Sequence, residues 1–89
     1  MPTPITEEEW KELVPENKII GQYGRCCTVT RHHRGASLCL VRPKGYDFDV
    51  WLEFKNGEIL CEGSPVEELN HPDAKIVPNP ISPQSQPGP

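Results

Sequence analysis

Residues 48–57 read Phe48-Asp49-Val50-Trp51-Leu52-Glu53-Phe54-Lys55-Asn56-Gly57. Apolar residues recur at every second position from Phe48, which is the period of a half-buried β-strand. The Asn-Gly pair favours a type I′ hairpin turn, because both central residues of that turn need a positive φ. This turn fixes the register of the next strand, so that Phe54 faces Ile59 and Leu52 faces Cys61.

Two further turn signals lie upstream of this hairpin. Pro43-Lys44-Gly45 fits a three-residue loop, because proline starts a type I turn and glycine takes the left-handed position. This loop pairs Leu38 with Val50, and a tight turn at Arg34-Gly35 pairs Val29 with Leu40. Together the three turns predict that the core face of a sheet carries Cys27, Val29, Leu38, Leu40, Phe48, Val50, Leu52, Phe54, Ile59 and Cys61.

The N-terminal part of the chain predicts a helix over residues 7–14. Thr6-Glu7-Glu8-Glu9 is a capping box, with Ile5 and Trp10 at the two hydrophobic-staple positions. Pro15 disfavours helical geometry at the residue before it. A helix this short is not stable alone, so we expect it to dock on the sheet through Trp10 and Leu13.

Shorter elements are predicted before and after the strands that the three turns connect. Residues 18–20 and 75–77 fit edge strands, and Ser64-Pro65 predicts a helical turn near residues 65–69. The expected fold class is α+β. It is a small four- to five-stranded antiparallel meander, or a small open barrel, with one short N-terminal helix. We expect residues 1–77 to form a single globular domain and the proline-rich residues 78–89 to be a disordered tail.

The charges are segregated along the chain. All 13 carboxylates lie outside residues 17–46, although the net charge is −4. Four basic side chains, Arg31, His32, His33 and Arg34, cluster at the tip of a predicted hairpin. Such a tip fits an acidic surface on another protein. The alternative is a nucleic-acid-binding protein that uses the basic hairpin around residues 25–44. The net acidity, and a tip without an aromatic side chain to stack a base, weigh against it.

The second face of the predicted sheet carries Trp51, with Asp49, Glu53 and Leu60 beside it. A fully solvated face would be charged, whereas this one is half apolar. Either the N-terminal helix covers this face, or the face is an interface with another protein. A homodimer through the Trp51 face is a further alternative. These four residues and the basic tip are the predicted partner-binding site.

Catalytic, metal and cofactor sites are not predicted. Cys26, Cys27, His32 and His33 are adjacent pairs that point to opposite faces of a strand, and they lack the ligand spacing of structural zinc sites. Asp49 and Glu53 have no apolar pocket that would prepare them for acid–base work.

The expected function is therefore a small non-enzymatic protein-binding adaptor or regulatory domain. We expect reduced cysteines and a cytoplasmic location, because four cysteines occur without a secretory signal. No apolar stretch approaches the roughly 18 residues of a membrane span.

Overall fold

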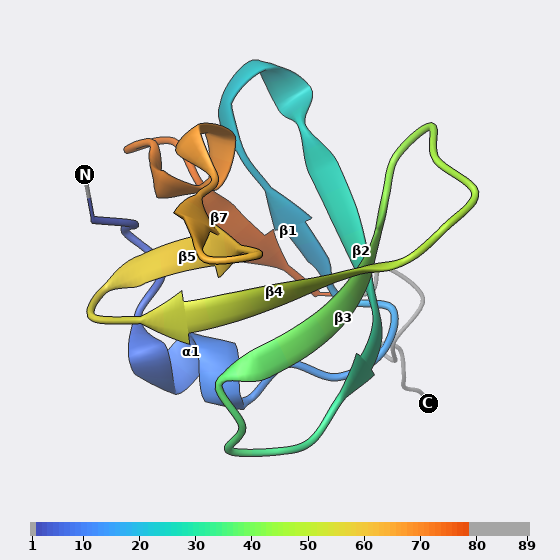
Figure 1. The fold of residues 1–89 in the computed structure, drawn as a ribbon, viewed down its shortest axis with the longest axis horizontal. Helices are drawn as coiled ribbons and strands as arrows, with labels where there is room; N and C mark the ends of the chain where they lie inside the picture. The colour runs from blue at the N-terminus through green and yellow to red at the C-terminus, as the bar shows by residue number, and fades with distance from the viewer. Residues whose placement is uncertain (1, 79–89) are drawn as a thin grey trace, which may run out of the picture.

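The computed structural model describes residues 2–78. Its strands are β1 (Lys18–Ile20), β2 (Cys26–His32), β3 (Leu38–Pro43), β4 (Val50–Lys55), β5 (Glu58–Cys61), β6 (Ser64–Pro65) and β7 (Lys75–Val77). Its helical segments are α1 (Glu7–Lys11) and the 3-10 turns η1 (Gln22–Gly24) and η2 (Glu67–Asn70). All strands join one antiparallel sheet in the order β6-β5-β4-β3-β2-β1-β7. Figure 1 shows this sheet curled into a half-barrel, with α1 beside it.

The predicted antiparallel sheet is confirmed, but the α+β prediction of a four- to five-stranded meander is wrong. The sheet has 7 strands, and the single α-helix in residues 2–78 spans 5 residues, so the fold is mostly β. β1, β6 and β7 have only 2 or 3 residues each. β1 and β7 coincide with the two predicted short strands, whereas β6 was predicted as part of a helical turn. A two-residue strand has no readable periodicity, and β6 forms because β5 offers it a hydrogen-bonding edge. β1 also pairs with both β2 and β7, so it is not an edge strand.

The β4–β5 hairpin has the predicted register. Phe54 pairs with Ile59, and the φ angles of Asn56 and Gly57 are 53° and 78°. Both central residues are therefore left-handed, as a type I′ turn requires. This prediction is confirmed. A two-residue turn fixes the register because it leaves the two strands only one way to align.

The β3–β4 register differs from the prediction by three residues. Leu38 pairs with Glu53 instead of Val50, and Val41 pairs with Val50. The turn at Pro43 does form, since the Tyr46 amide donates to the Pro43 carbonyl at 3.1 Å. However, the chain continues as a loop to Asp49 before β4 begins. An odd shift exchanges the two faces of a strand.

Three of the predicted core positions are wrong: the exchange of faces in β3 overturns Leu38 and Leu40, and Phe48 lies in the loop before β4. Cys39 and Val41 are fully buried, whereas Leu38 and Phe48 are half exposed and Leu40 points to the outer face with Trp51. The core residues are Ile5, Trp10, Leu13, Ile19, Cys27, Val29, Cys39, Val41, Leu52, Ile59, Leu69 and Ala74.

A β-bulge interrupts the β2–β3 ladder at Thr30. Val29 pairs with Val41, but the next pair is Arg31 with Leu40, so Thr30 is the extra residue. The predicted pairing of Val29 with Leu40 is wrong because the β2–β3 connection is longer than a tight turn at Arg34-Gly35: His32 already pairs with Cys39, two residues beyond the predicted partner, and the bulge reduces this difference to one residue at Val29. A bulge reverses the alternation beyond it. Arg31 therefore lies on the outer face and His32 on the inner one.

α1 lies at the end of the half-barrel that also holds the β2–β3 and β4–β5 turns. Its capping box is confirmed: the Glu9 amide donates to the Thr6 hydroxyl at 3.0 Å, and the Thr6 amide donates to the Glu9 carboxylate at 2.9 Å. The helix stops at Lys11, earlier than predicted. Trp10 is fully buried, and its indole Nε1 donates to the Ser37 carbonyl at 2.9 Å.

η2 lies at the opposite end, beside the β1–β2 connection. The predicted helical turn near 65–69 is displaced toward the C-terminus, because Ser64 and Pro65 pair with β5 as strand β6. Leu69 enters the core, and a Cβ on Gly21 would stand 2.3 Å from the Glu68 carbonyl. The two segments are therefore in close backbone contact. The predicted tail lies, except for Pro78, outside the described residues.

Candidate binding surfaces

The outer face of the sheet presents its side chains in cross-strand rows. Leu38, Glu53 and Leu60 form one row across β3, β4 and β5. Leu40 and Trp51 belong to the neighbouring row. Directly opposed side chains on one face lie within contact distance of each other. The alternation of β4 thus brings Trp51, Glu53 and Leu60 to one surface.

These rows border a hollow of about 470 Å³. Its lining includes Leu38, Phe48, Asp49, Trp51, Glu53, Leu60 and Glu62, which we call the Trp51 face. Leu38, Phe48 and Trp51 are 48%, 52% and 50% exposed. Three large apolar side chains around one hollow form a contiguous apolar patch, which is typical of an interface. Neither α1 nor η2 contributes to the lining, so no helix covers this face among residues 2–78.

Carboxylates surround the apolar centre of the Trp51 face. Asp49 is neutralised locally, because Arg42 Nε donates to its carboxylate at 2.6 Å and the Thr30 hydroxyl lies 3.3 Å away. Glu53 and Glu62 make no ion pair within the described part of the chain. The Trp51 face therefore combines an apolar centre with two uncompensated negative charges.

The predicted basic tip is not one cationic cluster. Arg34 pairs with Glu12 of the segment after α1 at 3.1 Å. His32 is half buried, with Nδ1 3.1 Å from the Leu13 carbonyl and Nε2 3.2 Å from the Ala36 carbonyl. The imidazole thus lies between the segment after α1 and the β2–β3 turn. Because carbonyls only accept, a neutral ring donates to one of the two, and its tautomer decides which. Of the predicted set, only Arg31 and His33 present open basic groups.

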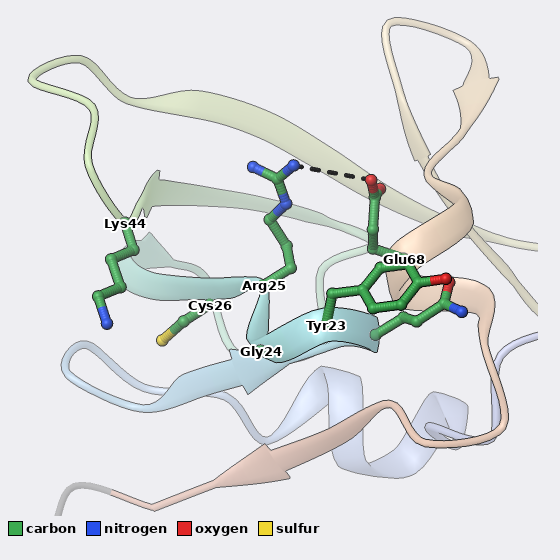
Figure 2. Close-up of a pocket in the computed structure, with 7 residues that line it drawn as sticks. Tyr23, Gly24, Arg25, Cys26, Lys44 and Glu68 are labelled. Carbon is green, nitrogen blue, oxygen red and sulfur yellow. Dashed lines mark ion pairs between the residues drawn. The ribbon is translucent and has the colours of Figure 1, made fainter.

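A second basic surface lies at the other end of the half-barrel. Its Arg25 and Lys44 fall within the basic region around residues 25–44 of the alternative prediction, but none of its residues is in the predicted partner-binding site. A hollow of about 590 Å³ is lined by Lys18, Arg42, Lys44 and Tyr46, among others. A contiguous hollow of about 250 Å³ shares Lys44 with it and adds Tyr23, Arg25 and Glu68. Figure 2 shows Lys44 on one side of Cys26, with Arg25 and Tyr23 on the other. We call Lys18, Tyr23, Arg25, Lys44 and Tyr46 the Lys44 surface. The acid-free stretch of residues 17–46 was its signal in the sequence.

The four cysteines, all within the described residues, are free thiols. Burial raises the pKa of Cys27 from 9.0 to about 11, and it raises the pKa of Cys39 to about 12. A protonated thiol is a poor nucleophile and a poor metal ligand. Within residues 2–78, no three His, Cys, Asp or Glu side chains are grouped so that they could hold a metal ion.

Comparison with known proteins gives no relative: no family model, curated protein or solved structure matches the chain. None of the helices in residues 2–78 has the length and apolar character needed to cross a bilayer.

Proposed function

We propose that the protein is a non-enzymatic adaptor or regulatory domain that binds another protein through its Trp51 face. The observation that carries this proposal is the exposure of Leu38, Phe48 and Trp51 around one hollow. Tryptophan is enriched among the residues that contribute most of the binding energy at protein interfaces. A reducing, cytoplasmic environment is part of the proposal, since it fits the free cysteines.

The charges of the Trp51 face favour a partner segment with apolar and basic side chains. Apolar groups of the partner would fill the hollow beside Trp51, and lysine or arginine would meet Glu53 and Glu62. Opposite charges at the rim of an interface accelerate association and exclude partners of like charge. Arg31 stands in the cross-strand row of Leu40 and Trp51, but neither it nor His33 lines this hollow. The proposed contact in the hollow therefore does not require the basic tip.

A second copy of the chain fits the Trp51 face less well. In a two-fold symmetric dimer the same patch faces itself. Glu53 and Glu62 would then approach the same carboxylates of the second copy. Like charges brought together at an interface oppose association.

The test uses the purified protein as bait, with a matched Trp51→Ala variant captured in parallel. Each protein retained by wild type is then purified and titrated directly against both baits. We expect the Trp51→Ala bait to bind at least about 30-fold more weakly, which corresponds to about 2 kcal/mol. Its urea unfolding midpoint should match that of wild type, because Trp51 is half exposed.

Two controls separate the proposal from its alternatives. Glu53→Gln should weaken association at low salt but not at high salt, as expected for rim charges. An equal affinity of wild type and Trp51→Ala for every retained protein would contradict the proposal. So would wild type that sediments as a dimer while Trp51→Ala sediments as a monomer, since a second copy would then occupy the face.

A further inference from the structure

We propose that the Lys44 surface binds single-stranded nucleic acid, with Tyr23 and Tyr46 stacking on bases and Lys18, Arg25 and Lys44 contacting phosphates. This surface lies on the half of the sheet that contains β7, β1 and β2, away from the β4–β5 half that carries most of the Trp51 face. It therefore adds a second binding activity and does not depend on the function proposed above.

The strand order concentrates positive charge on this half of the sheet. β7, β1, β2 and β3 are neighbours, and none of them contains an acidic residue. Ile19 is fully buried, so Lys18 and Ile20 point outward, and Lys75 pairs with Ile20 on the same face. Acidic side chains are instead carried by β4 and β5. The outer face is thus divided into a basic half and an apolar, acidic half.

The cations of the Lys44 surface are largely uncompensated. Lys18 and Lys44 make no ion pair in residues 2–78, and the Lys18 ammonium is held by the Thr28 hydroxyl at 3.3 Å. Arg25 has only a loose contact with Glu68, at 3.7 Å (Figure 2). Because both of these side chains are partly exposed, a phosphate can replace the Glu68 carboxylate at small cost.

Tyr23 supports a nucleic acid over other polyanions. It is 91% exposed and has a φ of 60° and a ψ of 27°, a left-handed conformation that tyrosine rarely adopts. Such backbone conformations concentrate at functional sites. The conformation holds an aromatic ring in solvent near Arg25 and Glu68, in the hollow whose other side is lined by Lys44 (Figure 2). Aromatic rings beside a cationic groove are the stacking platforms of proteins that bind single strands.

Tyr46 offers a second ring, in the loop that also carries Lys44. It is half exposed, lines the larger hollow, and is fixed by an edge contact with Phe48 at a centroid distance of 5.2 Å. Each of the two hollows of the Lys44 surface thus contains one tyrosine. Bases of a single strand are free to reach such rings, whereas the bases of a duplex are stacked on each other.

The experiment measures the fluorescence anisotropy of a labelled oligothymidine of about twelve nucleotides, a length within the site sizes of single-strand binders. The full chain is titrated at several salt concentrations. Changing Lys18 and Lys44 together to Gln should weaken binding about tenfold. It should also lower the slope of log affinity against log salt by about 1.4, since each phosphate contact with a single strand contributes about 0.7.

Matched variants test each part of the surface. Lys55→Gln removes a lysine at the far end of β4 and should leave the affinity unchanged. Tyr23→Asn keeps a residue that tolerates the left-handed backbone but removes the ring, so it should weaken binding at least about fivefold. Tyr23→Phe should bind as wild type does. Glu68→Gln should strengthen binding, because it releases Arg25.

Four outcomes would overturn the proposal. They are no binding at low salt, equal loss for Lys55→Gln and the double variant, equal affinity for duplex and single strand, and full competition by polyglutamate. Trp51→Ala should bind the oligonucleotide as wild type does. The nucleic-acid proposal and the adaptor proposal can therefore be contradicted independently of each other.

Discussion

The Asn70 side chain hydrogen-bonds the backbone amide and carbonyl of Ile59, as a neighbouring strand would. Its Oδ1 accepts the Ile59 amide at 2.8 Å, and its Nδ2 donates to the Ile59 and Val66 carbonyls at 2.9 Å each. The side chain is 4% exposed. A buried polar group is stable only when it is hydrogen-bonded. Asn70 therefore fastens η2 to β5: it supplies the acceptor for the Ile59 amide, and it adds a second donor to carbonyls that already accept from the Val66 and Leu69 amides.

Asn70→Ala should lower the free energy of unfolding by about 1–3 kcal/mol, because it leaves the buried Ile59 amide without the Asn70 acceptor. Urea unfolding measures the loss. Asn17→Ala is the matched control, since the Asn17 side chain caps an exposed turn at the Val14 amide. It should cost less than about 1 kcal/mol. Equal losses for the two variants would mean that the Asn70 bonds do not hold η2.

The buried thiols of Cys27 and Cys39 predict destabilisation at alkaline pH. Their pKa values are raised from 9.0 to about 11 and about 12, so the folded state retains protons that the unfolded state releases above pH 9. The contribution of these thiols to stability is complete below pH 9. It is lost as the pH rises through the folded values.

Urea unfolding between neutral pH and about pH 11 checks this prediction. For each thiol, the loss in the free energy of unfolding is at most roughly 1.4 kcal/mol per unit of pKa shift. Tyrosine and lysine also titrate in this range. The Cys27→Ala and Cys39→Ala double variant therefore serves as the reference. A wild type and a double variant with the same alkaline slope would contradict the assignment.

At the scale of elements, α1 is held by its contacts and not by its own helical stability. It spans 5 residues, far fewer than an isolated helix needs. Trp10 connects it to two parts of the sheet: the indole donates to the Ser37 carbonyl, and the ring packs against Phe54 at 5.7 Å. The capping box determines the first residue of the helix, and Trp10 determines where the helix packs against the sheet.

Trp10→Ala should destabilise the protein by about 3–5 kcal/mol, as expected for a fully buried tryptophan. Trp10→Phe keeps the ring against Phe54 and removes the indole donor of the Ser37 carbonyl, which still accepts from the Phe54 amide at 2.9 Å. It should therefore cost about 0.5–1.5 kcal/mol, the net worth of one hydrogen bond. Thermal and urea unfolding measure both. An unfolding midpoint of Trp10→Ala equal to that of wild type would show that α1 is not docked.

At the scale of the whole molecule, β7 extends the sheet beyond the region that carries clear strand patterns. Ile76 pairs with the fully buried Ile19 and packs on the core, whereas Val77 pairs with Lys18 on the outer face. Ile76→Ala should therefore cost about 1–3 kcal/mol, less than a fully buried isoleucine because Ile76 is half buried. Val77→Ala is the matched control and should cost under about 0.5 kcal/mol. A neutral effect of Ile76→Ala in urea unfolding would contradict the seven-stranded sheet.

The sequence alone determined the features that depend on neighbouring residues. The Asn56-Gly57 turn fixed the β4–β5 register, Thr6 and Glu9 fixed the start of α1, and alternation in β4 turned Trp51 outward. Each of these depends on contacts over a few residues, where backbone geometry leaves few choices. The part of the Trp51 face contributed by β4 and β5 could therefore be predicted.

Only the tertiary structure decided which face of β3 is buried. Residues 38–41 are Leu-Cys-Leu-Val, apolar at every position, so their pattern favours neither face. The loop after Pro43 and the bulge at Thr30 set the register, and both depend on partners distant in sequence. The Lys44 surface was hidden for the same reason. Lys18, Arg25 and Lys44 come from three separate segments, and they meet only because the sheet brings β1, β2 and the β3–β4 loop together.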